Sequence, residues 1–145
     1  MRSVLRGIVY IAAAFVLSAC SMNETSGPSP ALPNSSWVAT SIDDSPVIDD
    51  AQPSLAFDAN LNVSGNSSCN RLTGSATVAG KALNFGALAT TRMACAEALM
   101  EQELRFFVAL NEVQSWAIDP DSGELLLNNS AGRPIIRLDP ATAEE

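Results

Sequence analysis

The chain has 145 residues and is acidic, with 16 Asp and Glu against 8 Lys and Arg and a formal net charge of −8. Nucleic acid is therefore not an expected partner, because binding to phosphates requires a basic face. The chain contains no histidine, which excludes a Ser-His-Asp triad, a Cys-His pair and the commonest metal ligand. We expect no catalytic residues, no resident metal and no cofactor.

The N-terminus has the pattern of an export signal. Arg2 and Arg6 lie in a short basic region, and an apolar run over 7–17 follows. This run is about half of the ~20 residues that a membrane-spanning helix needs. It ends in the letters LSAC at 17–20, which resemble the bacterial lipobox. The resemblance implies cleavage before Cys20 and attachment of lipid to its sulfur. The alternative is an ordinary signal peptide with an incidental cysteine.

The residue after the cysteine bears on location. In bacterial lipoproteins an Asp at this place is typical of inner-membrane retention, whereas here it is Ser21. The resemblance thus implies an outer-membrane, lipid-anchored protein facing the periplasm. Removal of residues 1–19 takes away two arginines and leaves 6 basic and 16 acidic residues, a formal charge of −10. Residues 20–33 are rich in Ser and Pro, which predicts a flexible tether behind the lipidated cysteine.

The remaining chain suits one domain over residues 34–140, followed by an acidic tail at 141–145. Trp37 anchors the first predicted strand, SSWVATSI, and DDSPVIDD reads as a loop. SLAFDANLNVSGN predicts two strands around a turn at 58–60, and GSATVAGKALNF predicts two more that turn at Gly80.

A helix is predicted over about 94–112, because this segment is free of Gly and Pro and rich in helix formers. Thr90 or Thr91 is placed to cap its start. The periodicity predicts an apolar face made of Met100, Phe107 and Leu110, flanked by Leu104 and Phe106.

Glu103 falls on the same predicted helix face. It is either a rim residue whose carboxylate reaches water, or a partly buried carboxylate paired with Arg92 or Arg71. An unpaired buried charge would be costly, so we expect one of these two arrangements.

Three short strands are expected after the helix. VQSWAID and ELLLNN flank PDSG, which predicts a hairpin, and PIIRLD is the last strand. The spacing of Asp119, Asp121 and Glu124 also fits a calcium loop. A turn is favoured, because Pro, Asp and Gly at these places are typical of turns.

Two cysteines remain after Cys20 is assigned to lipid. Cys69 and Cys95 make an even number in an oxidising compartment, which favours a disulfide. Two alternatives stay open. Zinc would need carboxylates beside the two thiolates, without CxxC spacing to support it. Cu(I) would use the two thiolates with Met93.

The order of motifs resembles the META domain family, which includes the bacterial HslJ-like lipoproteins. The resemblance covers most of residues 34–139 and is most specific in GNSSCNRLTG, LATTRMAC and the predicted helix. It implies a mainly β (α+β) fold: a small antiparallel barrel-like sheet of about 7–8 short strands with one helix inserted. The family's usual Gly-Cys-Asn is Ser68-Cys69-Asn70 here, which puts the local turn geometry in question.

A candidate binding or structural corner surrounds the two cysteines, made of Asn70, Arg71, Thr91, Arg92 and Glu103. Asn70 can bond its own backbone in a turn, and Arg71 can hold a carboxylate. The threonine and Arg92 precede a helix N-terminus, where N–H groups favour anions. A hydrogen-bonded structural corner is the favoured interpretation.

Three classes of function remain open. The first, favoured mainly by the resemblance, is a non-catalytic envelope lipoprotein that supports envelope integrity or stress tolerance through contacts with another envelope protein. The second is a binding module for a small apolar ligand or for a basic protein partner that it inhibits, which the acidic charge makes reasonable. The third, an enzyme, is disfavoured for lack of a catalytic constellation.

Overall fold

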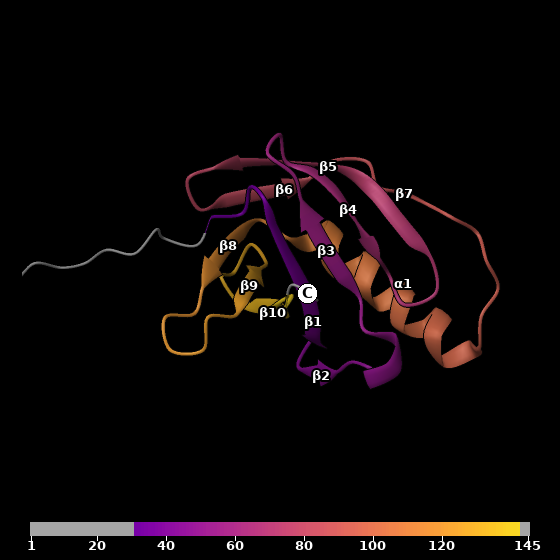
Figure 1. The fold of residues 1–145 in the computed structure, drawn as a ribbon. Helices are drawn as coiled ribbons and strands as arrows, with labels where there is room; N and C mark the ends of the chain where they lie inside the picture. Colours follow the sequence, from indigo (N-terminus) through magenta and orange to yellow (C-terminus); the bar gives the residue numbers. More distant parts are fainter. Residues whose placement is uncertain (1–30, 143–145) are drawn as a thin grey trace, which may run out of the picture.

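A computed structural model describes residues 31–142 (Figure 1). The predicted signal peptide, the predicted lipidation site Cys20 and most of the predicted tether lie outside the described residues, as do the last three residues of the predicted acidic tail. Within the described part of the chain, no helix is long and apolar enough to cross a bilayer.

Eight antiparallel strands form a closed barrel. The strand order is β10-β9-β8-β6-β5-β4-β3-β1, and pairing of β1 with β10 closes it. Two short strands add to it: β2 pairs with β1, and β7 pairs with β5. The bounds are β1 Ser35–Ile42, β2 Ser45–Pro46, β3 Ser54–Phe57, β4 Asn62–Asn66, β5 Arg71–Ala79, β6 Ala82–Phe85, β7 Ala89–Thr90, β8 Ser115–Ile118, β9 Leu125–Asn128 and β10 Pro134–Pro140.

The predicted fold class is therefore confirmed: over residues 31–142 the protein is mainly β, with one α-helix beside a small antiparallel barrel. The predicted turns are also present. Between β3 and β4, the Asp58 carboxylate accepts hydrogen bonds from the backbone N–H groups of Asn60 and Asn62. Gly80, with a φ of 61°, turns the chain between β5 and β6. At such a positive φ an L side chain is strained and glycine is not.

The barrel core arises from alternation along the strands. In β5, for example, Leu72 and Ala76 are buried while Arg71 and Thr73 are exposed, as expected when alternate side chains point to opposite faces. Leu32 is also fully buried in this core. The folded domain thus begins earlier than the predicted boundary at residue 34, because a residue assigned to the tether fills part of the hydrophobic interior.

The helix, α1, spans Glu97–Glu112 and lies across the barrel, packing against β1, β6 and β10 (Figure 1). It begins three residues later than predicted. The predicted threonine cap is wrong: Ala96 is the N-cap, and no side chain caps the helix there. The physical reason is that Thr90 belongs to β7, and the hydroxyl of Thr91 is engaged by Asn70.

The predicted apolar face of the helix is wrong in part. The face that packs on the barrel contains Gln102, Phe106, Ala109 and Leu110. Met100 and Leu104 instead point outward, with 48% and 65% of their surface exposed. Apolar residues occupy both sides of this helix, so their periodicity alone does not define which side meets the sheet.

Candidate functional site: the Asn70 corner

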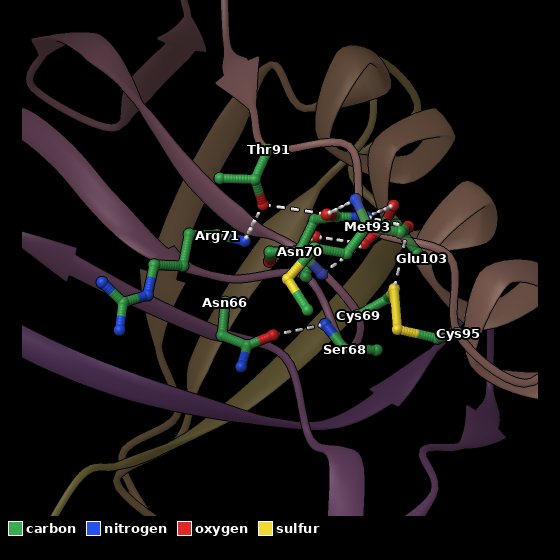
Figure 2. The surroundings of a disulfide bond; sticks show 10 residues. Asn66, Ser68, Cys69, Asn70, Arg71, Thr91, Met93, Cys95 and Glu103 are labelled. Atoms are coloured by element: carbon green, nitrogen blue, oxygen red, sulfur yellow. Dashed lines mark hydrogen bonds between the residues drawn. A yellow bond between two sulfur atoms is a disulfide. The ribbon is translucent and has the colours of Figure 1, made fainter.

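The disulfide predicted from the sequence is present. Cys69 and Cys95 are bonded, and their Cα atoms lie 5.9 Å apart. The bond joins the segment before β5 to the segment before α1 (Figure 2). Both sulfurs are used in this bond, so neither thiolate is left for the zinc or Cu(I) alternatives.

Asn70 is the centre of the polar cluster beside the disulfide, and only 4% of it is exposed. Its side-chain Oδ1 accepts hydrogen bonds from the Thr91 hydroxyl at 2.8 Å and the Met93 N–H at 2.7 Å. Its Nδ2 donates to Glu103 Oε1 at 2.9 Å. One amide therefore joins the β4–β5 connection to both the segment before α1 and α1 itself (Figure 2).

Glu103 is the carboxylate of the corner and is partly buried. Its Oε2 accepts hydrogen bonds from the Ser67 hydroxyl at 2.6 Å and the Asn70 N–H at 2.9 Å. Burial alone would raise the pKa of Glu103, but the hydrogen bonds from Ser67 and Asn70 outweigh it and hold the pKa below its ordinary value of 4.5. The charged form is thus the one that the fold stabilises.

The second of the two arrangements expected for Glu103, pairing with Arg92 or Arg71, does not occur. Arg71 and Arg92 are exposed, and among the ion pairs of residues 31–142 neither arginine appears. Arg71 contributes only backbone groups: its N–H donates to Thr91 Oγ1 at 3.1 Å, and its carbonyl accepts a hydrogen bond from the Thr91 N–H at 3.1 Å. Its side chain points away from the cluster (Figure 2). Neutral hydroxyl and amide donors take the place of the cation and satisfy the carboxylate.

The structure thus brings together three of the five predicted corner residues through their side chains: Asn70, Thr91 and Glu103. Arg92 lies in the exposed connection between β7 and α1 without taking part in the cluster's hydrogen bonds. Residues 93–96 separate Arg92 from the first residue of α1, so Arg92 does not stand directly before the helix N-terminus.

Gln102 is a member of the corner that the sequence did not point to. It is fully buried. Its Oε1 accepts the Ile48 N–H at 2.8 Å, and its Nε2 donates to the Ala51 carbonyl at 2.9 Å and the Ser68 hydroxyl at 2.8 Å. The sequence feature that could have indicated its burial is its position four residues before Phe106, which places both on the side of the helix that packs on the barrel.

Ser68 occupies the place of the family's usual glycine and keeps a glycine-like backbone, with a φ of 98°. This region strains an L residue. Two hydrogen bonds hold it there: its N–H donates to Asn66 Oδ1 at 2.7 Å, and its hydroxyl accepts from Gln102. The departure from Gly-Cys-Asn therefore leaves the turn intact.

The polar atoms of this corner are engaged with one another, which fits the structural interpretation over a binding one. Ser67 illustrates this, because its hydroxyl and its N–H both contact the Asn70 carbonyl at 2.8 Å. Elsewhere, the Asp119 carboxylate accepts the N–H groups of Asp121 and Ser122, as a turn requires. Over residues 31–142 no cluster of three His, Cys, Asp or Glu residues is placed to hold a metal.

The barrel interior is filled by aliphatic side chains together with Trp37, Phe57 and Phe106. Two of the surface grooves of the described residues lie beside α1. The first, of about 300 Å³, runs between the chain at 86–90 and the helix residues Phe107 and Asn111. The second, of about 480 Å³, lies over the start of α1 and is lined by Cys95, Glu97, Met100, Glu101 and Leu104.

Fold and site together define a class: over residues 31–142, a small, closed antiparallel β-barrel with one helix, joined to it by a disulfide and by the hydrogen bonds between Asn70 and the partly buried Glu103. The chain belongs to the META domain family, whose model matches residues 30–142. The resemblance predicted from the sequence motifs is therefore confirmed.

Solved structures share the fold. A protein from Burkholderia xenovorans, determined by NMR, is 26% identical, with a TM-score of 0.63 over 77% of this chain and 84% of the other. A second NMR structure is 27% identical, with a TM-score of 0.55 over 74% of this chain and 88% of the other. A DUF4847 family protein from Bacteroides vulgatus, 14% identical with a TM-score of 0.56 over 78% and 96% of the two chains, shows the fold alone. No curated protein matches the chain.

Proposed function

We propose that this META-domain protein is a non-catalytic lipoprotein of the bacterial outer membrane, anchored through Cys20 and facing the periplasm. Its role is to support envelope integrity or stress tolerance by contacting another envelope protein. The LSAC letters at 17–20 and the following Ser21 support the anchor and its location.

The observation that carries the non-catalytic part is the engagement of Asn70 and Glu103. A general acid or base must present its reacting atom to a substrate. Both carboxylate oxygens of Glu103 instead accept hydrogen bonds from Asn70, and one also accepts from Ser67. The densest polar cluster among the described residues therefore acts to hold three chain segments together.

A basic protein partner is favoured over a small apolar ligand. The chain carries twice as many acidic as basic residues, so its field attracts cations and basic surfaces. A small apolar ligand would need a hollow interior, and side chains such as Phe106 and Leu83 fill that of this barrel.

The anchor is tested by Cys20→Ala in the full chain. We expect the variant to accumulate as an unprocessed precursor that incorporates no labelled palmitate, while wild-type protein is labelled and sediments with outer-membrane fractions on a sucrose gradient. Labelling of the variant would refute lipidation at Cys20. Recovery of wild type wholly with the inner membrane would refute the outer-membrane location.

The role is tested by removing the protein from cells. Entry of a dye that intact envelopes exclude should rise after heat stress in cells lacking the chain, and wild-type protein should restore exclusion. Cys20→Ala should fail to restore it, because an unanchored domain is not held at the membrane. Equal dye entry with and without the protein would overturn the proposed role.

A further inference from the structure

The helix α1 has an outer face that the fold does not use. Among residues 31–142, five large apolar side chains are strongly exposed, and three of them lie on this helix: Met100, Leu104 and Val108, at 48%, 65% and 49%. They are spaced by four residues and so form one continuous stripe. Burial against the barrel does not explain them, because Phe106 and Leu110 supply that face.

This stripe borders the groove of about 480 Å³ at the start of the helix. Met100 and Leu104 provide its apolar lining, and Glu97 and Glu101 stand in the same lining. Both glutamates are exposed. An apolar floor with carboxylates beside it accepts a segment that carries apolar and basic side chains together.

The charge of the helix selects the partner. α1 contains four glutamates and a single basic residue, Arg105. A second copy of the chain carries the same two glutamates on this face, so self-association would bring together surfaces of like charge, which is disfavoured. An anionic lipid surface is disfavoured for the same reason. Methionine, which adapts its shape to varied side chains, suits a contact with another protein.

The position of the face also suits a partner. The described chain starts at the side of the barrel away from the N-terminal half of α1 (Figure 1). A domain held through its N-terminal segment thus keeps the start of α1 remote from the point where the chain enters the barrel.

We propose that this face, made of Met100, Leu104 and Val108 with Glu97 and Glu101, docks a basic apolar segment of another envelope protein. The inference rests on the proposed function and names the surface through which it acts. The apolar stripe supplies the buried contact, and the two glutamates select a basic partner and set its register.

The test is photo-crosslinking in cells with the full chain, using a benzophenone amino acid in place of Leu104. We expect an adduct with another protein, whose crosslinked peptide carries Lys or Arg interleaved with apolar residues. Glu97→Gln/Glu101→Gln should lower the adduct yield about fivefold, as expected for the loss of two partly screened ion pairs. In isolated envelopes, salt well above physiological strength should lower it too.

Two matched controls separate this surface from the general acidity of the chain. Asp121→Asn/Asp139→Asn also removes two exposed charges, but outside α1, and should leave the yield within about twofold of wild type. A benzophenone in place of the exposed Ala131, in the turn between β9 and β10, should not produce the adduct.

Several results would overturn the docking surface: no adduct from position 104, an adduct with a second copy of the chain, an adduct with lipid, or a yield insensitive to Glu97→Gln/Glu101→Gln. The dye-entry assay distinguishes this failure from that of the proposed function. If the surface is wrong but the function right, cells lacking the chain still admit dye. If the function is wrong, they exclude it whatever crosslinks are found.

Discussion

Two kinds of carboxylate site occur in this domain. Asp58 and Asp119 accept backbone N–H groups two to four residues further along the chain. Glu103 accepts hydrogen bonds only from residues that lie 33 to 36 positions away, on the other side of the disulfide. The carboxylates of all three have a pKa below the ordinary value.

The difference lies in what each site holds together. The carboxylates of Asp58 and Asp119 stabilise turns within their own hairpins. Glu103 joins α1 to the β4–β5 connection, so its contacts exist only when the barrel and helix have assembled. We therefore expect damage at the Asn70 corner to affect the whole domain, and damage at the turns to remain local.

The largest effect is expected from the disulfide. Cys69→Ser/Cys95→Ser opens a link between positions 26 residues apart, which contributes about 3.5 kcal/mol in the loop-entropy model. The melting temperature should fall by ~10 °C or more while the β-rich circular dichroism persists, because the barrel strands do not depend on the bond. Two free thiols in the denatured, non-reduced wild-type domain would show that the Cys69–Cys95 disulfide does not form.

The next largest effect is expected from Asn70→Ala. It removes the Nδ2 donor from the partly buried Glu103 and leaves the Met93 N–H without its acceptor. The backbone N–H of residue 70 remains, so we expect a loss of about 2–3 kcal/mol in the free energy of unfolding, measured by urea denaturation. The control Asn84→Ala, at an exposed position in β6, should change it by less than ~0.5 kcal/mol. Equal effects would mean that the corner is not structural.

A smaller effect is expected in the pH dependence of stability. The pKa of Glu103 is lowered in the folded state, so its contribution is present above about pH 4.5 and is lost as pH falls through the lower, folded-state value. Glu103→Gln should therefore lose less stability than wild type when thermal melts are compared at pH 6 and pH 3. An unchanged difference between the two pH values would show that the Glu103 hydrogen bonds do not favour its charged form.

The smallest effect is expected at the turns. Asp119→Ala removes the acceptor of the Asp121 and Ser122 N–H groups, but these groups are at the surface, where water replaces the lost bond. The fall in melting temperature should be clearly smaller than for Asn70→Ala, with faster amide exchange confined to 119–124. The control Asp121→Ala, in the same turn, should leave amide exchange over 119–124 unchanged. A fall as large as that of Asn70→Ala would erase the distinction between the two kinds of site.

The sequence alone determined most of the β structure, because its signals are local. The strand alternation around Leu72 and Ala76, the turn at 58–60 and the glycine at 80 depend on neighbouring residues and backbone preferences. The Cys69–Cys95 pairing was also within reach, because only two cysteines remain if Cys20 is the predicted lipidation site, and the oxidising compartment predicted from the export signal favours a disulfide.

Only the tertiary structure decided which side of α1 is buried and what satisfies Glu103. The helix is apolar on two sides, and the curved sheet covers the one with Phe106 while leaving Leu104 in solvent. The partners of Glu103 and Gln102 come from segments 33 to 54 residues away. Such contacts depend on how the barrel closes. Neither the periodicity of the helix nor the expectation that a buried carboxylate pairs with an arginine predicts them.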